Sequence, residues 1–306
     1  MIVVVCPGQG SQTPGFLEPW LAIPGFEADL RDMSAAVGID LLAHGTTSDS
    51  DTIRDTAIAQ PLIVAAGLLT LKVLLAQGRR DRVAGIAGHS VGEITAAAGA
   101  GILSSTDALR FVRERGLAMQ SAAGLEPTGM SAVVGADEAA LLEQLAELDL
   151  EAANFNGAGQ IVVAGALDAL AALAANPPAR ARVIPLQVAG AFHTRYMRPA
   201  VPHLTAVAAS LQSHAPTMQI WSNSSGSTVS DGAHFVDLLV GQVSSPVRWD
   251  MCMHSFAEAG VTGIIEVAPA GALVGLAKRG LKGVPSVAIK TPDDLPAAFE
   301  MIDQQP

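Results

Sequence analysis

The chain of 306 residues contains only two cysteines, Cys6 and Cys252, and they do not form a C-x-x-C pair. This speaks against a disulfide scaffold and a cysteine zinc site, and it fits a reducing cytoplasm. The seven histidines are scattered, with no H-E-x-x-H or similar ligand spacing. We therefore expect no metal ion and no permanently bound cofactor.

Positive charge is also scarce, since 18 Lys and Arg residues stand against 29 Asp and Glu, for a formal net charge of −11. Such a chain is not expected to bind nucleic acid. The apolar run at residues 2–6 is short and lacks a basic segment, so it does not predict a signal peptide. Residues 61–75 are apolar but interrupted by Lys72, which predicts a core helix and no membrane span.

The abundant residues of the chain are small and apolar: half of all residues are hydrophobic and only 4% are aromatic. This composition is typical of an α/β protein with many packed helices, and the length suits one large domain with a small insert. Residues 2–6, ended by Pro7 and Gly8, form an apolar run that predicts a central parallel strand. Residues 83–87 form a second run of this kind.

Residues 88–92 read Gly-His-Ser-Val-Gly, between the second apolar run and a small-residue segment. Strand, sharp turn and helix form the context of a G-x-S-x-G nucleophile elbow, which favours Ser90 as a nucleophile over a structural turn. The N–H of Val91 at the start of the helix is a candidate oxyanion donor. His89 adjoins Ser90, but neighbouring side chains at such a turn point apart, so we expect it to pack or hydrogen-bond elsewhere.

The segment after the first strand, residues 8–12, reads Gly-Gln-Gly-Ser-Gln. It lacks the G-K-[ST] of a phosphate loop and the G-x-G-x-x-G spacing. Two interpretations stay open: a simple glycine turn, or a loop whose Gln9 N–H is a second oxyanion donor. The second follows if both strands end at the same edge of a parallel sheet, where α/β sites form.

From residue 127 the pattern changes. Strands are predicted at residues 130–134, 152–156, 160–164 and 182–188, and helices at 137–148 and 167–175. The order β-α-β-β-α-β is that of a ferredoxin-like unit. We therefore expect a ferredoxin-like subdomain at residues 127–189, inserted into a catalytic domain made of residues 1–126 and 190–306.

In the large domain, Asp55 is expected to cap the approach to a helix at residues 62–76. A second helix begins at a cap within residues 104–106 and ends near residue 122. Beyond the insert, helices are predicted at residues 197–211, 234–243, 249–259 and 271–281, and strands at 219–223, 263–267 and 287–289.

A nucleophilic serine needs a base, and His193 follows the last predicted strand of the insert. From the residues alone, a structural histidine and a general base are equally good interpretations. The helix at residues 104–122 carries Arg110, Arg113 and Arg115. A guanidinium can bind a carboxylate through two parallel hydrogen bonds, although Arg110 and Arg113 are typical of a solvated face.

These segments, taken in order over residues 2–282, resemble the malonyl-CoA:acyl carrier protein transacylases of bacterial fatty-acid synthesis, of the actinobacterial sort. The residues that carry the resemblance are Pro7 to Gln12, Gly88 to Glu93, Arg115-Gly116, Met119-Gln120, Asn154 to Asn156, Gly190 to His193, Gln242, Pro246 to Trp249, Glu266 to Gly271 and Leu276 to Arg279. The chain departs from the family at Cys6, where several members have Phe, and at residues 268–271, where Gly-Pro-Gly is commoner.

The resemblance implies an α/β-hydrolase-like large domain with a mostly parallel sheet, and a ping-pong transfer of malonyl through an ester on a serine. It implies that Ser90 is the nucleophile and His193 its base, held by the backbone carbonyl of Gln242 in place of an acid. The oxyanion donors would be the N–H groups of Gln9 and Val91. Arg115 would bind the malonyl carboxylate, and the remaining implied substrate contacts are Gln9, Asn156 and Phe192, the last resembling the variant that crowds branched donors.

Three rival functions remain from the sequence. A serine esterase or thioesterase could use the same elbow, but a buried Arg115 serves no purpose for a neutral ester. The transacylase subunit of a malonate decarboxylase would share the chemistry with another carrier. A scaffold that only binds acyl chains would not need Ser90, His193, Arg115 and the glycine loop together.

The expected partners are malonyl-CoA and the phosphopantetheine arm of an acyl carrier protein, with no nucleic acid or membrane, and we expect a monomer. Carriers of this type are acidic, as is this chain, so docking needs a local basic patch. The candidates, each of which could equally be ordinary surface charge, are Arg195 and Arg198, and Lys278, Arg279 and Lys282. We also expect acylation to slow as pH falls through the ordinary titration of His193.

Overall fold

Strand β1 (Ile2–Cys6) lies in the middle of a parallel sheet, and all of its residues are buried. The computed structural model describes residues 1–305. Strands β2 (Val83–Gly88) and β9 (Gly263–Glu266) flank β1, and β7 (Gln219–Trp221) and β10 (Ser286–Ala288) lie outside them, in the order β10-β9-β1-β2-β7. Every neighbouring pair is parallel. The sequence therefore predicted the α/β class and the mostly parallel sheet correctly.

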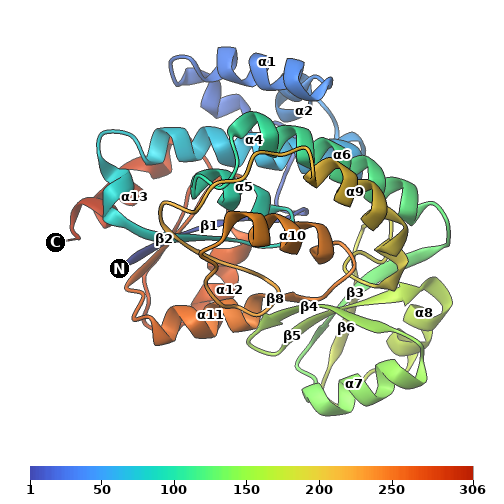
Figure 1. Cartoon of the computed structure of the whole chain (residues 1–306). Coiled ribbons are helices and arrows are strands. Elements are labelled where there is room, and N and C mark those ends of the chain that lie inside the picture. The colour runs from blue at the N-terminus through green and yellow to red at the C-terminus, as the bar shows by residue number, and fades with distance from the viewer. Residues whose placement is uncertain (306) are drawn as a thin grey trace.

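The two faces of this sheet are covered by different helices (Figure 1). Ile2, Val4 and Cys6 belong to the core formed with α4 (Thr56–Leu74), α5 (Gly92–Gly99) and α6 (Ser105–Ala123). Val3 and Val5 belong to the core formed with α11 (Trp249–Glu258) and α12 (Ala272–Gly280). Because successive side chains of a strand point to opposite faces, one continuous apolar run fills both cores.

Helix α4 begins six residues earlier than the sequence predicted. Asp55 caps it by accepting a hydrogen bond from the N–H of Ala57 at 2.8 Å, and Pro61 lies inside the helix. A proline cannot donate to the carbonyl four residues back. Here that carbonyl, on Ala57, instead accepts a hydrogen bond of 3.1 Å from Nη1 of Arg113, so the helix continues through Pro61.

Within residues 1–305, α4 is the one helix that is long and apolar enough to cross a membrane by length and composition. The structure buries 83% of its most hydrophobic window inside the protein. The interpretation of this stretch as a core helix therefore agrees with its packing.

A second, smaller sheet is formed mainly by residues 128–185, in the order β6-β3-β5-β4-β8. The chain order is β3 (Thr128–Val134), α7 (Glu138–Glu147), β4 (Glu151–Gly157), β5 (Gln160–Ala166), α8 (Leu167–Ala175) and β6 (Arg182–Pro185). These strands pair antiparallel, and α7 and α8 cover the outer face of the sheet (Figure 1). The last strand, β8 (Val247–Arg248), comes from far along the chain and pairs with β4 in parallel. The sheet therefore reaches beyond residues 127–189.

Two further predicted elements differ from the structure. The strand predicted at residues 182–188 ends at Pro185. The N–H of Leu186 still donates to the carbonyl of Met130 at 3.0 Å, but the N–H of Val188 turns back to the carbonyl of Leu186, and both residues line a cavity. The helix predicted at residues 197–211 is a 3-10 helix, η3 (Arg195–Ala200), followed by α9 (Val201–Ala208). Pro199 lies inside η3 and a second proline lies in the first turn of α9, so a continuous α-helical hydrogen-bond ladder cannot form.

The other elements surround the parallel sheet. Helix α12 is held at its N-terminus by buried Glu266, whose carboxylate accepts hydrogen bonds from the N–H groups of Gly271, Leu273 and Val274. The N-terminal ammonium donates to the side chain of Gln305 at 2.8 Å, so the two ends of the chain meet (Figure 1). The remaining elements are η1 (Glu18–Ala22), α1 (Phe26–Val37), α2 (Leu41–Thr46), α3 (Ser50–Arg54), η2 (Arg79–Arg82), α10 (Gly232–Gln242), η4 (Pro292–Asp294) and α13 (Leu295–Asp303).

Candidate active site

Ser90 lies in the sharp turn between β2 and α5, and its φ of 54° is in the left-handed region. This conformation costs a non-glycine residue about 1 to 2 kcal/mol, so the surroundings must hold it. Asn223, just after β7, does so: its Oδ1 accepts the N–H of Ser90 at 2.8 Å and its Nδ2 donates to the carbonyl of Gly88 at 2.7 Å.

The two glycines of the turn permit a very close approach of backbones. A Cβ on Gly92 would lie 2.1 Å from the carbonyl oxygen of Cys6, and one on Gly88 would lie 2.0 Å from the carbonyl carbon of Gly92. The end of β1 therefore lies directly against the start of α5. This contact brings the loop after β1, with Gln9, to the same edge of the sheet as Ser90.

Ser90 and His193 are hydrogen-bonded, with 2.7 Å between Oγ of the serine and Nε2 of the imidazole. Nδ1 of the same ring is 2.8 Å from the carbonyl oxygen of Gln242 at the end of α10. A carbonyl only accepts, so Nδ1 carries the proton and Nε2 is free to take the proton of Ser90. The structure thus brings together three residues that are 103 and 49 positions apart in the chain.

Burial, and then the positive charge of Arg115, lower the pKa of His193 to about 3, against an ordinary value of 6.5. His193 is 4% exposed. It is therefore neutral and able to accept a proton throughout the range in which a free histidine titrates. This corrects the expectation that acylation slows as pH falls through the ordinary titration of histidine, because desolvation moves the titration to a much lower pH.

The N–H groups of Gln9 and Val91 are placed for an oxyanion. Both residues line the cavity that holds Ser90, and among residues 1–305 no acceptor takes either N–H. Val91 also immediately precedes α5, so the positive end of that helix is directed at the same place. The side chain of Gln9 donates to the backbone of Arg54 and to Thr56, which fixes the loop.

The cavity in front of Ser90 has a volume of about 360 Å³. One wall is polar: Asn156 accepts a hydrogen bond of 2.9 Å from Nε2 of His89 and donates to Gln160. His89 therefore points away from Ser90, toward the small sheet. The rest of the lining is largely apolar and includes Phe192, and the further apolar lining residues are Met119, Met130, Val162, Leu186, Val188, Leu273 and Leu276.

Arg115 is 1% exposed and lies behind this cavity without lining it. Its Nη1 donates to Oε1 of Gln60 at 2.7 Å and its Nη2 to Oε1 of Gln242 at 2.8 Å, while its Nε is without a partner among residues 1–305. Burial lowers its pKa to about 10, so the guanidinium keeps its charge at neutral pH. Gln60 lines the cavity and stands between the cation and the open space.

The other two arginines of α6 differ in their surroundings. Arg110 is exposed beside Asp107, as the pattern of a solvated face predicts. Arg113 is half-buried and supports α4, so for this residue the solvated interpretation was wrong.

Three residues of the site were not predicted: Gln60, Glu93 and Asn223. Buried Glu93 accepts hydrogen bonds from the N–H of Asn223, at 2.6 Å, and from the side chain of Gln242. Burial raises its pKa to about 8, against the pull of these hydrogen bonds and of Arg115. A signal was present for each: a lone amide in an apolar helix, a lone acid in a small-residue helix, and an amide where a parallel strand ends.

The candidate docking residues also differ in their surroundings. Arg195 is in ion pairs with Asp149 and Glu151, so it is not free surface charge, and this corrects its place in a basic patch. Lys278, Arg279 and Lys282 are exposed at and just beyond the C-terminal end of α12, and Arg279 also lines the cavity. Arg198 is exposed on η3.

The acyl transferase domain family matches residues 3–292. The malonyl CoA-acyl carrier protein transacylase of Mycobacterium tuberculosis is 50% identical over 299 residues, which cover 96% of this chain and 98% of the relative. The crystal structure of MCAT from Mycobacterium tuberculosis has a TM-score of 0.95 at 49% identity, with 98% of this chain and 99% of the other covered.

A further solved structure is described as a type II PKS acyl-carrier protein in complex with its malonyl-transacylase. It has a TM-score of 0.92 at 29% identity and covers 98% of this chain and 99% of the other. No group of three or more His, Cys, Asp or Glu side chains that could hold a metal ion is found in the part of the chain that the structure describes.

Proposed function

Because the chain belongs to the acyl transferase domain family, we propose that it transfers the malonyl group of malonyl-CoA to the thiol of an acyl carrier protein through an ester on Ser90. The family resemblance drawn from the sequence is confirmed by the comparisons. One observation carries the chemistry: Ser90 Oγ lies 2.7 Å from a neutral, buried His193 whose other nitrogen is fixed by a carbonyl.

In the first half-reaction, His193 Nε2 takes the proton of Ser90 as Oγ attacks the thioester carbonyl. The carbonyl oxygen becomes an oxyanion, which accepts hydrogen bonds from the N–H groups of Gln9 and Val91. Collapse breaks the carbon–sulfur bond. The departing thiolate takes the proton from His193, which leaves free CoA and malonyl-Ser90.

In the second half-reaction, the thiol at the end of the carrier's phosphopantetheine arm replaces CoA. It gives its proton to His193 and attacks the ester carbonyl, and the oxyanion forms against the same two donors. When the carbon–oxygen bond breaks, Ser90 recovers its proton from His193. The mixed lining of the cavity, with apolar residues such as Phe192 and polar residues such as Asn156, suits an arm that carries both methylene and amide groups.

The malonyl carboxylate is assigned to Arg115. Both bonded nitrogens of the guanidinium now face neutral amide oxygens, and a carboxylate is a stronger partner for a desolvated cation. Gln60 must turn aside for the carboxylate to reach Nη1, because its side chain occupies that position at the cavity wall. This step favours a charged donor over a neutral one.

The direct test is mass spectrometry of the protein after mixing with malonyl-CoA. We expect a malonyl adduct on Ser90, which disappears when a carrier protein with its phosphopantetheine arm is added. Rapid release of CoA without an adduct would indicate an esterase or thioesterase instead. An unchanged protein would indicate a scaffold.

The proposal also covers the domain organisation, cellular location, oligomeric state and docking surface of the protein. The large body is α/β-hydrolase-like, formed by residues 1–126 and 190–306, and residues 127–189 are a ferredoxin-like subdomain, supported by the strand order β6-β3-β5-β4. The protein acts as a cytoplasmic monomer without membrane or nucleic acid. The exposed cluster Lys278, Arg279 and Lys282, beside the cavity, is proposed as the site where an acidic carrier docks.

A further inference from the structure

The short segment that carries His193 is fastened to the small sheet on both sides of the histidine. Before it, the N–H of Ala191 donates to Oγ1 of Thr128, the first residue of β3, at 3.1 Å. After it, the N–H of Arg195 donates to Oε2 of Glu151, the first residue of β4, at 3.2 Å. His193 thus lies between two hydrogen bonds that join its segment to the small sheet.

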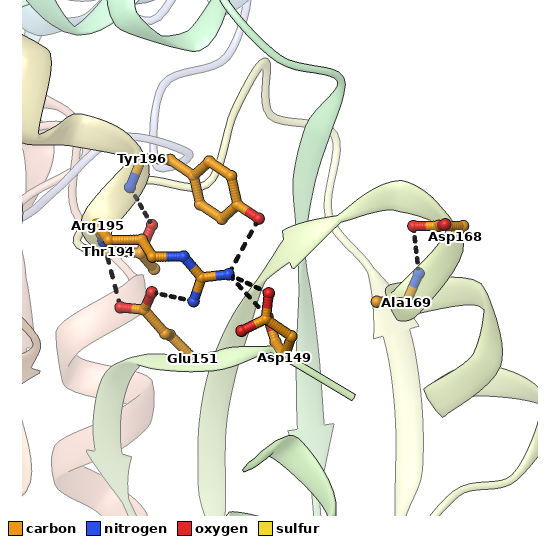
Figure 2. A network of polar contacts seen from close by, with 7 residues as sticks. All are labelled: Asp149, Glu151, Asp168, Ala169, Thr194, Arg195 and Tyr196. Carbon is orange, nitrogen blue, oxygen red and sulfur yellow. Dashed lines mark hydrogen bonds and ion pairs between the residues drawn. The ribbon is translucent and has the colours of Figure 1, made fainter. Parts of the chain in front are cut away.

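The second attachment is reinforced by the side chain of Arg195 (Figure 2). Its Nη1 donates to the other oxygen of Glu151 at 2.7 Å, so this carboxylate binds both the backbone and the guanidinium of one residue. Its Nη2 donates to Oδ2 of Asp149 at 2.6 Å and to the hydroxyl of Tyr196 at 3.2 Å. Figure 2 shows the guanidinium between the two acids and the tyrosine.

The backbone of His193 needs such support. Its φ of 64° lies in the left-handed region, which a histidine adopts only when its surroundings impose it. The N–H of His193 donates a hydrogen bond to the carbonyl of Val243 at 3.0 Å, and Oγ1 of Thr194 donates one to the carbonyl of Ala191 at 2.6 Å. These contacts fix the turn itself, whereas the bonds to Glu151 fix where the turn lies relative to the small sheet.

We propose that Glu151 and Arg195 are positioning residues that hold the imidazole of His193 within hydrogen-bond reach of Ser90. Glu151 is the principal member, because its carboxylate binds the main chain two residues from the histidine. The inference rests on the proposed role of His193 as the base of malonyl transfer. Neither residue lines the cavity, so both act through His193 and touch no substrate.

Proton transfer depends steeply on this placement, since a displacement of about 1 Å can lower a rate about a hundredfold. Loss of Glu151 should therefore lower the acylation rate constant and leave the KM for malonyl-CoA unchanged. A residue that only stabilises the fold would change the melting temperature without changing the rate constant below melting.

The variants separate the two bonds of the attachment. Glu151→Ala removes the acceptor for both the backbone and the side chain of Arg195, and should lower the rate constant about tenfold to a hundredfold. Arg195→Ala keeps the backbone bond and should cost less, and Arg195→Lys, which restores a cation, should recover part of that loss. Asp149→Ala should have the smallest effect, because this acid is 85% exposed.

The matched control is Asp303→Ala. Asp303 pairs with Arg79, which lies over the ring of Phe299 at 4.0 Å, as Arg195 lies over Tyr196 at 4.8 Å. This pair joins η2 to the end of α13 and lies outside the candidate active site. Its loss should lower stability by a similar amount and leave the rate constant unchanged.

Two rates should be measured for every variant: malonyl loading from malonyl-CoA, and labelling of Ser90 by a fluorophosphonate. The second needs His193 but no malonyl group, so it tests the positioning even if malonyl transfer fails in the wild type. Parallel losses of both rates in the order Glu151→Ala, Arg195→Ala, Arg195→Lys support the proposal. Wild-type rates in Glu151→Ala, or an equal loss in Asp303→Ala, would overturn it.

Discussion

The carbonyl oxygen of Gln242 lies 2.8 Å from Nδ1 of His193 and replaces the carboxylate that orients histidine in many serine enzymes. A carbonyl fixes the tautomer of the ring but stabilises an imidazolium less than a carboxylate does. The side chain of the same glutamine accepts a hydrogen bond from Arg115 at 2.8 Å. Gln242 therefore joins the base to the cation that is proposed to bind the donor.

The pKa of His193, lowered to about 3, predicts an acylation rate that is nearly independent of pH between about pH 5 and pH 8. The neutral form, which is the proposed base, exists above the pKa, so activity should fall only as pH decreases toward about 3. Stopped-flow measurement of CoA release over this range checks it. An inflection near the ordinary value, about pH 6.5, would show that the ring is solvated in the working enzyme.

Replacement of Arg115 should change the choice of donor. Arg115→Ala removes a charge-assisted pair that is worth about 2 to 5 kcal/mol for a desolvated contact, so malonyl loading should fall tens-fold to thousands-fold. Acetyl-CoA has no carboxylate to lose and should be affected far less. Arg115→Lys should recover little, because an ammonium cannot make two parallel bonds.

The measurement for Arg115 is the ratio of malonyl to acetyl loading on Ser90 in the wild type and both variants. A ratio that stays constant while both rates fall would mean that Arg115 serves only to hold Gln242. The remaining hydrogen bonds of the Gln242 side chain, to Glu93 and to the carbonyl of Ser90, make that result unexpected.

Gly92→Ala should disrupt the elbow. The added Cβ would lie 2.1 Å from the carbonyl oxygen of Cys6, a backbone atom that cannot turn aside, so we expect a loss of stability of at least about 1 to 3 kcal/mol and slow labelling of Ser90. Gly241→Ala is the control, because nothing lies within 4 Å of its added Cβ and it is helical. It should gain up to about 1 kcal/mol. Urea denaturation measures both, and equal stability of the two variants would contradict the proposed close contact.

Reversal of charge at Lys278 and Lys282 to Glu should raise the KM for the carrier protein and leave the KM for malonyl-CoA unchanged. The reason is local attraction, since charges farther away than about 8 to 10 Å are screened at physiological salt. Lys72→Glu is the control, because Lys72 is paired with Asp29 and lines no part of the active cavity. Equal increases in both KM values would indicate that the cluster binds CoA phosphates instead.

The parts of the fold that sequence reasoning predicted well are those with strong local signals. Residues 2–6 are uniformly apolar and end at Pro7, and Ser104 caps α6 through the N–H of Asp107 at 3.0 Å. The predicted start of α4 was wrong because Pro61 looks like a helix start, and only the tertiary contact from Arg113 shows why the helix continues. The strand was predicted to extend over Leu186 and Val188 because apolar residues are typical both of a strand and of a cavity lining.

Local signals also explain which residues of the candidate site could be proposed from the sequence. The elbow is a local motif, so Ser90 and Val91 could be found from a few adjacent residues. His193 and Gln242 gained their roles only through the family resemblance, since a hydrogen bond between distant segments leaves no pattern in a single sequence. The local signals at Glu93 and Asn223, a lone acid and a strand-end amide, do not name a partner, and the hydrogen bonds of these residues form only after folding.

The pairing of β8 with β4 limits how far the insert can be treated as a separable module. Without Val247 and Arg248, the backbone of Asn154 and Phe155 would lose its neighbour and form an open sheet edge. Open edges recruit other chains, so an excised segment of residues 127–189 is prone to self-association. During synthesis the insert likewise stays incomplete until residue 248 has left the ribosome, which ties its final assembly to that of the large body.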